Sequence, residues 1–162
     1  MSGESLFYLG RRYQLKVRDQ KGTGSGVKLL RGQICVETSS HDPEVIKKRL
    51  AEWYRSRATD MFSRRLIEIA DRVVWLSRIP EWRIVRMQKQ WGSCSPAGVI
   101  LRSPHLVKAP RECVDYVICH ELCHLQEHNH SRRYYRLLGQ LMPGWQSIKA
   151  RLDGMAELLL NE

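Results

Sequence analysis

A long run of regularly spaced apolar residues constrains the fold of this chain more than any other feature. Between residues 43 and 73 the apolar positions recur every three or four residues, which is the spacing of one face of an α-helix. These positions are Val45, Ile46, Leu50, Trp53, Tyr54, Ala58, Met61, Phe62, Leu66, Ile69, Ala70 and Val73. Asp42 followed by Pro43 is typical of a helix start, with an N-cap residue before a proline in the first turn. The pattern predicts one long amphipathic helix, broken once at most, that ends before Pro80.

The residues before this helix have the pattern of short β-strands. Four segments are rich in apolar residues, and the second of them alternates between apolar and polar side chains. The segments are residues 6–9, 13–17, 27–30 and 33–36. Three glycines within residues 21–26 predict a turn between the second and the third strand. We therefore expect a short antiparallel β meander over residues 1–40.

The residues after the long helix predict a hairpin and then helices. Residues 83–87 and 99–101 have strand patterns, and turn-forming residues separate them. Three helices are expected over residues 111–128, 131–143 and 144–160. Strands, a long helix, a hairpin and further helices in this order indicate an α+β fold.

The length and composition of the chain fit one globular domain. With 162 residues the chain has a common single-domain length, and we expect one domain over residues 1–162, with the functional residues in 41–162. Five cysteines, an odd number, do not fit a disulfide framework and are interpreted as thiols. No apolar run approaches the ~20 residues of a membrane span, and the first residues lack signal-peptide features. We expect a cytoplasmic protein without a membrane partner.

One short motif carries recognisable chemistry. Residues 120–124 read His-Glu-Leu-Cys-His, an H-E-x-x-H sequence inside a predicted helix. Residues four apart on a helix lie on one face, about 6 Å apart along the axis, so His120 and His124 can bind one metal ion. Glu121 points toward the same pocket, where it can take a proton from a water held by zinc. The motif predicts a zinc-dependent hydrolase.

A catalytic zinc needs a third protein ligand, and two histidines are candidates. If the helix continued, His128 would lie about 12 Å along the axis from His120 and its direction would have drifted by about 80°. His130 follows Asn129, which tolerates the left-handed conformation found at helix ends. A chain that turns there brings His130 back to the metal. We favour His130 as the third ligand and expect His128 to be solvated or to lie outside the ligand shell.

Three stretches of the chain together are far more specific than the H-E-x-x-H motif alone. They are Trp-Gly-Ser-Cys-Ser at residues 91–95, Asp-Tyr-Val-Ile-Cys-His-Glu-Leu-Cys-His at 115–124 and Asn-His-Ser at 129–131. This combination resembles the YgjP-like zinc metallopeptidases, over about residues 82–152. The resemblance implies a minimal zincin-like fold, similar in motif layout to the SprT and Spartan-type proteases. It also implies zinc ligands at His120, His124 and His130, with Glu121 as the general base.

The chain departs from the family pattern at two places. Gln90 stands where members usually have arginine, and Tyr134-Tyr135 stands where they usually have Phe-Trp. None of these residues is an expected metal ligand, so the departures bear on substrate preference. Tyr134 and Tyr135 are candidates for contacts with the substrate or with the oxyanion formed during hydrolysis, although aromatic residues at this spacing more often serve packing. The residues of the turn around Ser93 and Cys94 are interpreted as small residues that let the hairpin approach the metal helix.

The strongly basic composition leaves a second class of function open. The chain has 27 Lys and Arg against 17 Asp and Glu, a formal net charge of +10, which attracts polyanions such as nucleic acid. The first hypothesis is a zinc metallopeptidase that acts on protein or peptide substrates. The alternatives are a nucleic-acid-associated module with a structural zinc, and a protease recruited to DNA by its basic surface. A closed four-ligand zinc site would favour the structural module, whereas an open fourth position favours the enzyme.

Overall fold

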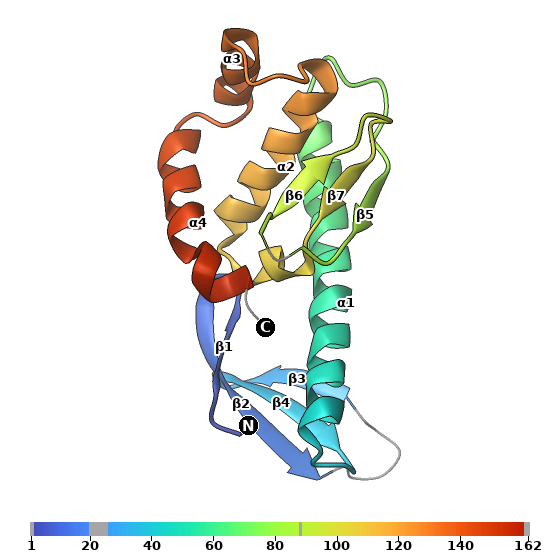
Figure 1. The fold of residues 1–162 in the computed structure, drawn as a ribbon, viewed down its shortest axis with the longest axis vertical. Coiled ribbons are helices and arrows are strands. Elements are labelled where there is room, and N and C mark those ends of the chain that lie inside the picture. The colour runs from blue at the N-terminus through green and yellow to red at the C-terminus, as the bar shows by residue number, and fades with distance from the viewer. Residues whose placement is uncertain (1, 20–25, 88, 161–162) are drawn as a thin grey trace.

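The predicted long helix is the central element of the structure, a computed structural model that describes residues 2–19, 26–87 and 89–160 (Figure 1). Helix α1 runs without a break over Pro43–Ala70. Asp42 caps its start, since the Asp42 carboxylate accepts a hydrogen bond of 3.0 Å from the backbone N–H of Glu44. One end of α1 carries a four-stranded sheet, and the other end carries the remaining helices and a small second sheet.

The first sheet lies at the amino-terminal end of α1. Its strands are β1 (Ser5–Tyr8), β2 (Arg11–Asp19), β3 (Gly26–Leu30) and β4 (Gln33–Thr38), in the order β1-β2-β4-β3. The expectation of a purely antiparallel meander is wrong at one pair, because β4 inserts between β2 and β3 and runs parallel to β2. In this register Leu15 lies beside Ile34, and all but 1% of either side chain is buried. The turn expected at residues 21–26 lies outside the described residues, except for Gly26.

The second sheet has three short strands at the other end of α1. They are β5 (Trp82–Ile84), β6 (Gly92–Cys94) and β7 (Ile100–Arg102), in the order β5-β7-β6. The expected hairpin between residues 83–87 and 99–101 is wrong, because β5 and β7 are parallel. The hairpin forms instead between β6 and β7, and β6 lies in the segment interpreted as a turn. Glycine, serine and cysteine have little intrinsic preference for strands, so pairing with β7 decides the conformation of β6.

The helices follow the predicted order. They are the short 3₁₀ helix η1 (Pro104–Lys108), α2 (Arg111–Gln126), α3 (Arg132–Leu141) and α4 (Trp145–Leu160). The three predicted helices therefore end within about two residues of their expected limits, and the α+β class is confirmed. No predicted element corresponded to η1. Among the described residues, no helix has the length and apolar character needed to cross a membrane.

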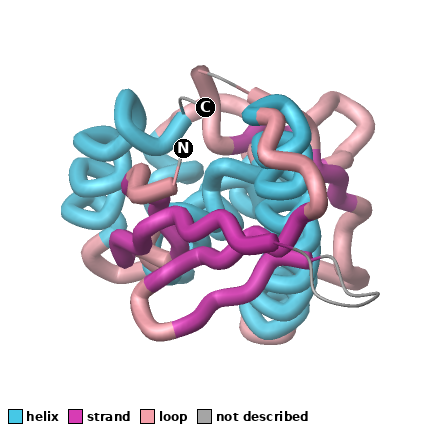
Figure 2. The backbone as a smooth tube through the Cα atoms, turned by 90° about the horizontal axis from the view of Figure 1, so that it is seen from below, coloured by secondary structure: helices cyan, strands magenta, loops and turns pink. Residues whose placement is uncertain are grey.

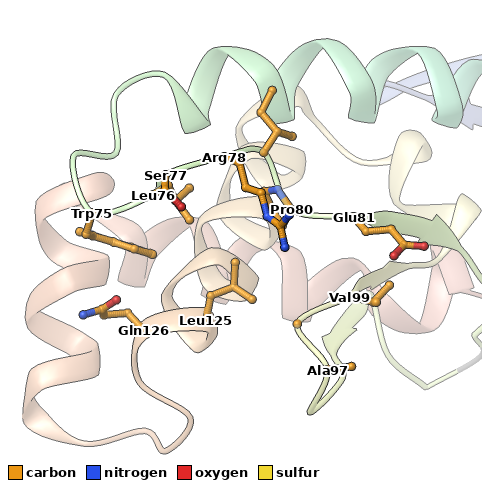
Figure 3. A pocket seen from close by; sticks show the side chains of 12 residues that line it. Trp75, Leu76, Ser77, Arg78, Pro80, Glu81, Ala97, Val99, Leu125 and Gln126 are labelled. Atoms are coloured by element: carbon orange, nitrogen blue, oxygen red, sulfur yellow. The ribbon is translucent and has the colours of Figure 1, made fainter.

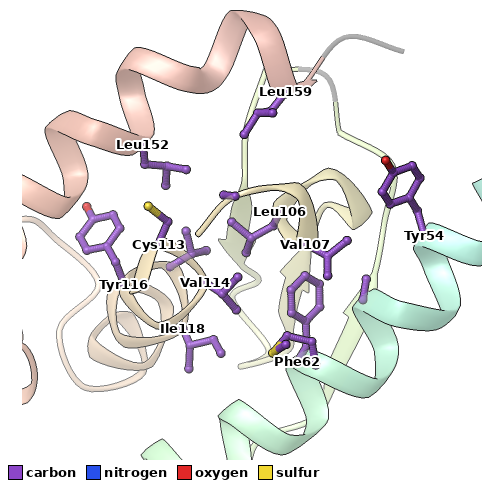
Figure 4. Packing of buried hydrophobic residues seen from close by; sticks show 14 of the residues in the cluster. Tyr54, Phe62, Leu106, Val107, Cys113, Val114, Tyr116, Ile118, Leu152 and Leu159 are labelled. Carbon is purple, nitrogen blue, oxygen red and sulfur yellow. The ribbon is translucent and has the colours of Figure 1, made fainter. Parts of the chain in front are cut away.

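The hydrophobic core lies where α1, η1, α2 and α4 meet (Figure 4). Phe62 of α1, Val107 of η1 and Ile118 of α2 are fully buried in it. Beside this core, Arg65 of α1 donates two parallel hydrogen bonds to the carboxylate of Asp115 in α2, of 2.7 Å from Nε and 2.9 Å from Nη2. The packing and the ion pair fix α2, which carries the H-E-x-x-H motif, against the central helix.

Candidate metal centre

The three histidines expected as ligands converge at the end of α2. His120 and His124 lie one turn apart on the same face of the helix, as the spacing predicts. His130 lies beyond the helix, and its Nε2 is 3.0 Å from Nε2 of His124. One ring nitrogen of each histidine lies within 4.8 Å of the others. Two histidines on α2 and one beyond its end thus bring their ring nitrogens together in one cluster.

The chain returns to this cluster by a different route from the one expected. Helix α2 ends at Gln126, and Glu127 has extended φ and ψ angles of −132° and 108°. Leu9 and Arg31 are the only described non-glycine residues with positive φ, so Asn129 does not take the left-handed conformation. The Ser131 hydroxyl then accepts a hydrogen bond from the Tyr134 N–H and caps α3. The extended Glu127 and the Ser131 cap together place His130 beside His124.

Tyr134 forms the floor beneath the three imidazole rings. Its ring is fully buried, with centroids 5.6 Å from His120, 4.7 Å from His124 and 4.9 Å from His130. Its hydroxyl donates a hydrogen bond of 2.9 Å to the carbonyl oxygen of His120. Tyr135, the other candidate for an oxyanion or substrate contact, is 43% exposed, and the centroid of its ring is 6.1 Å from that of His130. The two adjacent tyrosines therefore occupy different positions, one under the histidines and one beside them.

The protonation of His120 is set by burial. Burial lowers the pKa of His120 to about 4, and the neighbouring His124 and His130 act in the same direction. The imidazole is therefore neutral at physiological pH and keeps a lone pair for a metal ion. Its Nδ1 lies 3.4 Å from the hydroxyl oxygen of Tyr116, which leaves Nε2 free to face the cluster.

Glu121 occupies a buried position next to the histidines. Its side chain is 5% exposed, Oε1 lies 3.7 Å from Nε2 of His120, and Oε2 is buried without a hydrogen-bond partner among the described residues. Burial raises the pKa of Glu121 to about 7, while the positive charge of Arg102 acts in the opposite direction. A carboxyl group with such a pKa can both accept and release a proton near neutral pH.

Arg102 is a buried cation that the sequence analysis did not single out. Its side chain is fully buried, and Cζ lies 5.5 Å from the ring centroid of Phe62 and 5.9 Å from that of Trp82. Burial lowers the pKa of Arg102 to about 10, which leaves the guanidinium charged at neutral pH, and the Glu121 carboxylate opposes this shift. The signal that could have revealed it is an arginine two residues after Ile100, on the buried side of a short strand.

The second sheet closes one side of the site through Gly92 of β6. A Cβ atom added to Gly92 would lie 2.9 Å from the Leu101 carbonyl oxygen, 3.1 Å from Cγ1 of Val117 and 3.7 Å from Cγ of Glu121. This close approach confirms the interpretation that small residues let the hairpin approach the metal helix. The resulting pocket has a volume of about 560 Å³ and is lined by Gln90, Gly92, Ser93, Cys94, Ser95, Pro96, His120, Glu121, His124 and His128. His128 thus borders the pocket but does not join the nitrogen cluster.

A second hollow of about 550 Å³ lies beyond the turn of the hairpin (Figure 3). The segment after α1, the end of α2 and the β6–β7 turn form its walls, with Trp75, Leu125 and Val99 among the lining residues. None of the three clustered histidines lines this hollow. The chemistry of the molecule is therefore concentrated in the pocket on the β6 side.

The cluster fits a divalent metal ion. Neutral imidazole nitrogen is a common ligand of zinc and similar ions, and three such nitrogens bound at ~2.0–2.1 Å in tetrahedral geometry lie about 3.3 Å apart. The 3.0 Å separation of His124 and His130, and the 4.8 Å limit for the whole group, are compatible with that arrangement. The buried Oε2 of Glu121 lacks a hydrogen-bond partner among the described residues. A water held by a metal ion at the histidine cluster would supply the missing partner.

Comparison with known proteins agrees with this geometry. The model of the family described as YgjP-like, metallopeptidase domain, matches residues 1–155. The chain belongs to the YgjP-like metallopeptidase family. The match extends from the first sheet into α4, and its range covers the positions of the three histidines. No curated protein matches the chain.

Two solved structures with partial similarity are metallopeptidase zymogens. Abylysin of Pyrococcus abyssi is 23% identical, with a TM-score of 0.48 over 62% of this chain and 94% of the other. Jannalysin of Methanocaldococcus jannaschii is 19% identical, with a TM-score of 0.46 over 62% of this chain and 96% of the other. At these values neither likeness supports an inference about activity.

Proposed function

We propose that this YgjP-like protein is a zinc-dependent peptidase, with zinc bound by His120, His124 and His130. The observation that carries the proposal is the convergence of the three imidazoles beside the buried carboxyl group of Glu121. Among the described residues no further His, Cys, Asp or Glu side chain joins this cluster. Three protein ligands with an open position are typical of catalytic zinc, whereas structural zinc usually has four.

Glu121 acts as the general base and then as the general acid. When bound, zinc would act as a Lewis acid that polarises the scissile carbonyl group and lowers the pKa of a water molecule toward ~7. Glu121 takes the proton from the attacking water and delivers it to the leaving amine. Burial, which raises the pKa of Glu121 to about 7, suits a group that must gain and lose a proton in each cycle.

Strand β6 offers a place for a peptide substrate. In the order β5-β7-β6 it is an edge strand, and all three of its residues line the pocket of His120 and Glu121. An extended peptide can add to such an edge through main-chain hydrogen bonds. Tyr135 is exposed and its ring lies 6.1 Å from that of His130, so it is the candidate among the two tyrosines for a contact with a substrate side chain.

The test is hydrolysis of a mixed pool of unfolded proteins by the zinc-loaded chain beside Glu121→Gln. The parent is expected to cleave, and the variant is expected to bind one zinc and to lose cleavage by at least about a hundredfold. Glu112→Gln, which removes an exposed carboxylate at the far end of the same helix, is the matched control and should keep full activity. Full cleavage by Glu121→Gln, or none by the zinc-loaded parent, would contradict the proposal.

A further inference from the structure

The first sheet has two faces of opposite character. Along β2, Tyr13, Leu15 and Val17 point to the side that packs against α1, where Leu15 is 1% exposed. The alternate residues of the same strand project to the other side, because successive side chains of a strand point to opposite faces. They are Arg12, Gln14, Lys16 and Arg18, and all are exposed. Figure 2 views the molecule from the end that carries this sheet.

The neighbouring strands extend this outer face into a basic surface. Lys16 and Lys28 flank Cys35 in one row across β2, β4 and β3, and Cys35 is buried between them at 3% exposure. In the next row Arg18 lies beside Glu37, the one acidic residue that the register places on this face. We call the set Arg12, Lys16, Arg18 and Lys28 the basic face.

The cations of the basic face lack acidic partners. None of the four makes an ion pair with any other residue that the structure describes. Along β2, Lys16 and Arg18 are about 6.7 Å apart, and Arg12 lies about 13 Å from Lys16, with Gln14 between them. An unpaired row of like charges creates a positive potential that attracts a polyanion and releases its counterions on binding.

An aromatic ring borders the same surface. Phe7 of β1 is half-buried against the core, and its neighbour in the register is Arg12, whose Cζ is 5.4 Å from the centroid of the Phe7 ring. Gln14 and Gln33, paired between β2 and β4, add amide groups that can donate and accept hydrogen bonds. A cationic groove or face combined with an aromatic stacking partner is the arrangement by which proteins hold unpaired nucleotides.

We propose that the basic face binds single-stranded nucleic acid. The four cations contact phosphates of the strand, and Phe7 stacks on a base that only a single strand can present. A sheet face of this kind has no helix or ribbon to insert into the groove of a duplex, so a single strand is the better fit. The face lies at the end of the molecule away from α2 and α3, so a bound strand leaves the histidine pocket accessible (Figure 1). This proposal does not depend on the peptidase activity.

The test is fluorescence anisotropy with a labelled oligothymidylate of about 20 nucleotides, at about 50 and 200 mM salt. The full chain is expected to bind it, more tightly than a duplex of equal length. The variant Lys16→Glu/Lys28→Glu should bind at least about tenfold more weakly, with a salt slope lower by about 1.4 for two lost phosphate contacts on a single strand. Phe7→Leu should weaken binding of the single strand and leave binding of the duplex unchanged, since stacking needs an unpaired base.

The matched control is Arg132→Glu/Arg136→Glu, which changes the net charge equally on exposed residues of α3 at the other end of the molecule. Its affinity should stay within about threefold of the parent. Lys16→Gln/Lys28→Gln serves as a second variant in case charge reversal perturbs folding, and circular dichroism checks both. No binding by the parent at low salt, equal weakening by the two charge reversals, or a preference for the duplex would overturn the proposal. Peptide cleavage by the basic-face variants should equal that of the parent.

Discussion

The hydroxyl group of Tyr134 donates its hydrogen bond to the carbonyl oxygen of His120 and thereby joins α3 to the turn of α2 that carries the H-E-x-x-H motif. The same ring packs beneath all three clustered imidazoles. Because this hydroxyl is held inside the protein, we propose that it positions the histidines; of the two tyrosines, Tyr135 is the exposed one.

Tyr134→Phe tests this positioning role. The substitution keeps the ring but removes the hydrogen bond, so His120 is held less firmly and the zinc affinity should fall by about tenfold. Competition with a chelator of known affinity measures the change. Tyr135→Phe removes a hydroxyl from an exposed ring and should leave the zinc affinity unaltered. Equal affinities for the parent and Tyr134→Phe would refute the role.

Gly92→Ala tests the contact between β6 and α2. The added methyl group would lie 2.9 Å from the carbonyl oxygen of Leu101 in β7 and 3.1 Å from Val117 in α2, so β6 must shift relative to both elements. We expect a loss of about 1–3 kcal/mol in the free energy of unfolding and a clear fall in peptidase rate. Gly154→Ala is the control, because a Cβ at this position in α4 meets no atom within 4 Å and should stabilise the helix slightly. Unchanged stability and rate in Gly92→Ala would contradict the account.

Asp115→Asn tests the ion pair that fixes α2 on α1. Both side chains are about 15% exposed, and removing the charge leaves the guanidinium of Arg65 without its main partner. The free energy of unfolding, measured by chemical denaturation, should fall by about 2 kcal/mol. Asp153→Asn breaks the exposed pair with Lys149 and should cost no more than about 0.5 kcal/mol. If the two variants lose equal stability, the buried pair has no special role.

Burial of His105 in η1 predicts a dependence of stability on pH. Burial, aided by the positive charges of Lys108 and Arg86, lowers the pKa of His105 from 6.5 to about 4 in the folded chain. Between these values the unfolded chain binds the proton more readily, so stability falls as the pH drops from 6.5 to 4. The contribution of this group is on the order of 3 kcal/mol. His105→Asn should lack this pH-dependent contribution, so the free energies of unfolding of the metal-free parent and variant should converge or cross as the pH falls. A difference that stays constant with pH would contradict the prediction.

Much of the fold followed from local patterns in the sequence. The periodicity of α1 and the Asp42-Pro43 start are local, and the helix was predicted correctly. The placement of β4 beside β2 and the pairing of β5 with β7 depend on contacts between residues that are distant in the sequence, which local patterns do not contain. The two sheets were therefore the part of the fold predicted least well.

The candidate site was predictable for a similar reason. Helical geometry alone brings His120 and His124 together, and His130 was inferred from the need for a chain reversal, although Glu127 and Ser131 produce that reversal in place of a left-handed Asn129. Arg102 escaped notice because its importance lies in what it faces across the fold, and its sequence spacing does not link it to the motif. Tyr116 lies one helical turn before His120 on the same face of α2, so its spacing could have linked it to the motif.

X-ray absorption at the zinc edge tests the central claim most directly. The zinc-loaded chain should show three imidazole nitrogens at about 2.0–2.1 Å and one further light atom from an exchangeable ligand. His130→Ala should lose one imidazole from this set, whereas His128→Ala should leave it intact, because His128 lies outside the nitrogen cluster. A sulfur ligand at about 2.3 Å, or a fourth imidazole supplied by His128, would show a closed structural site and contradict the assignment of a catalytic metal.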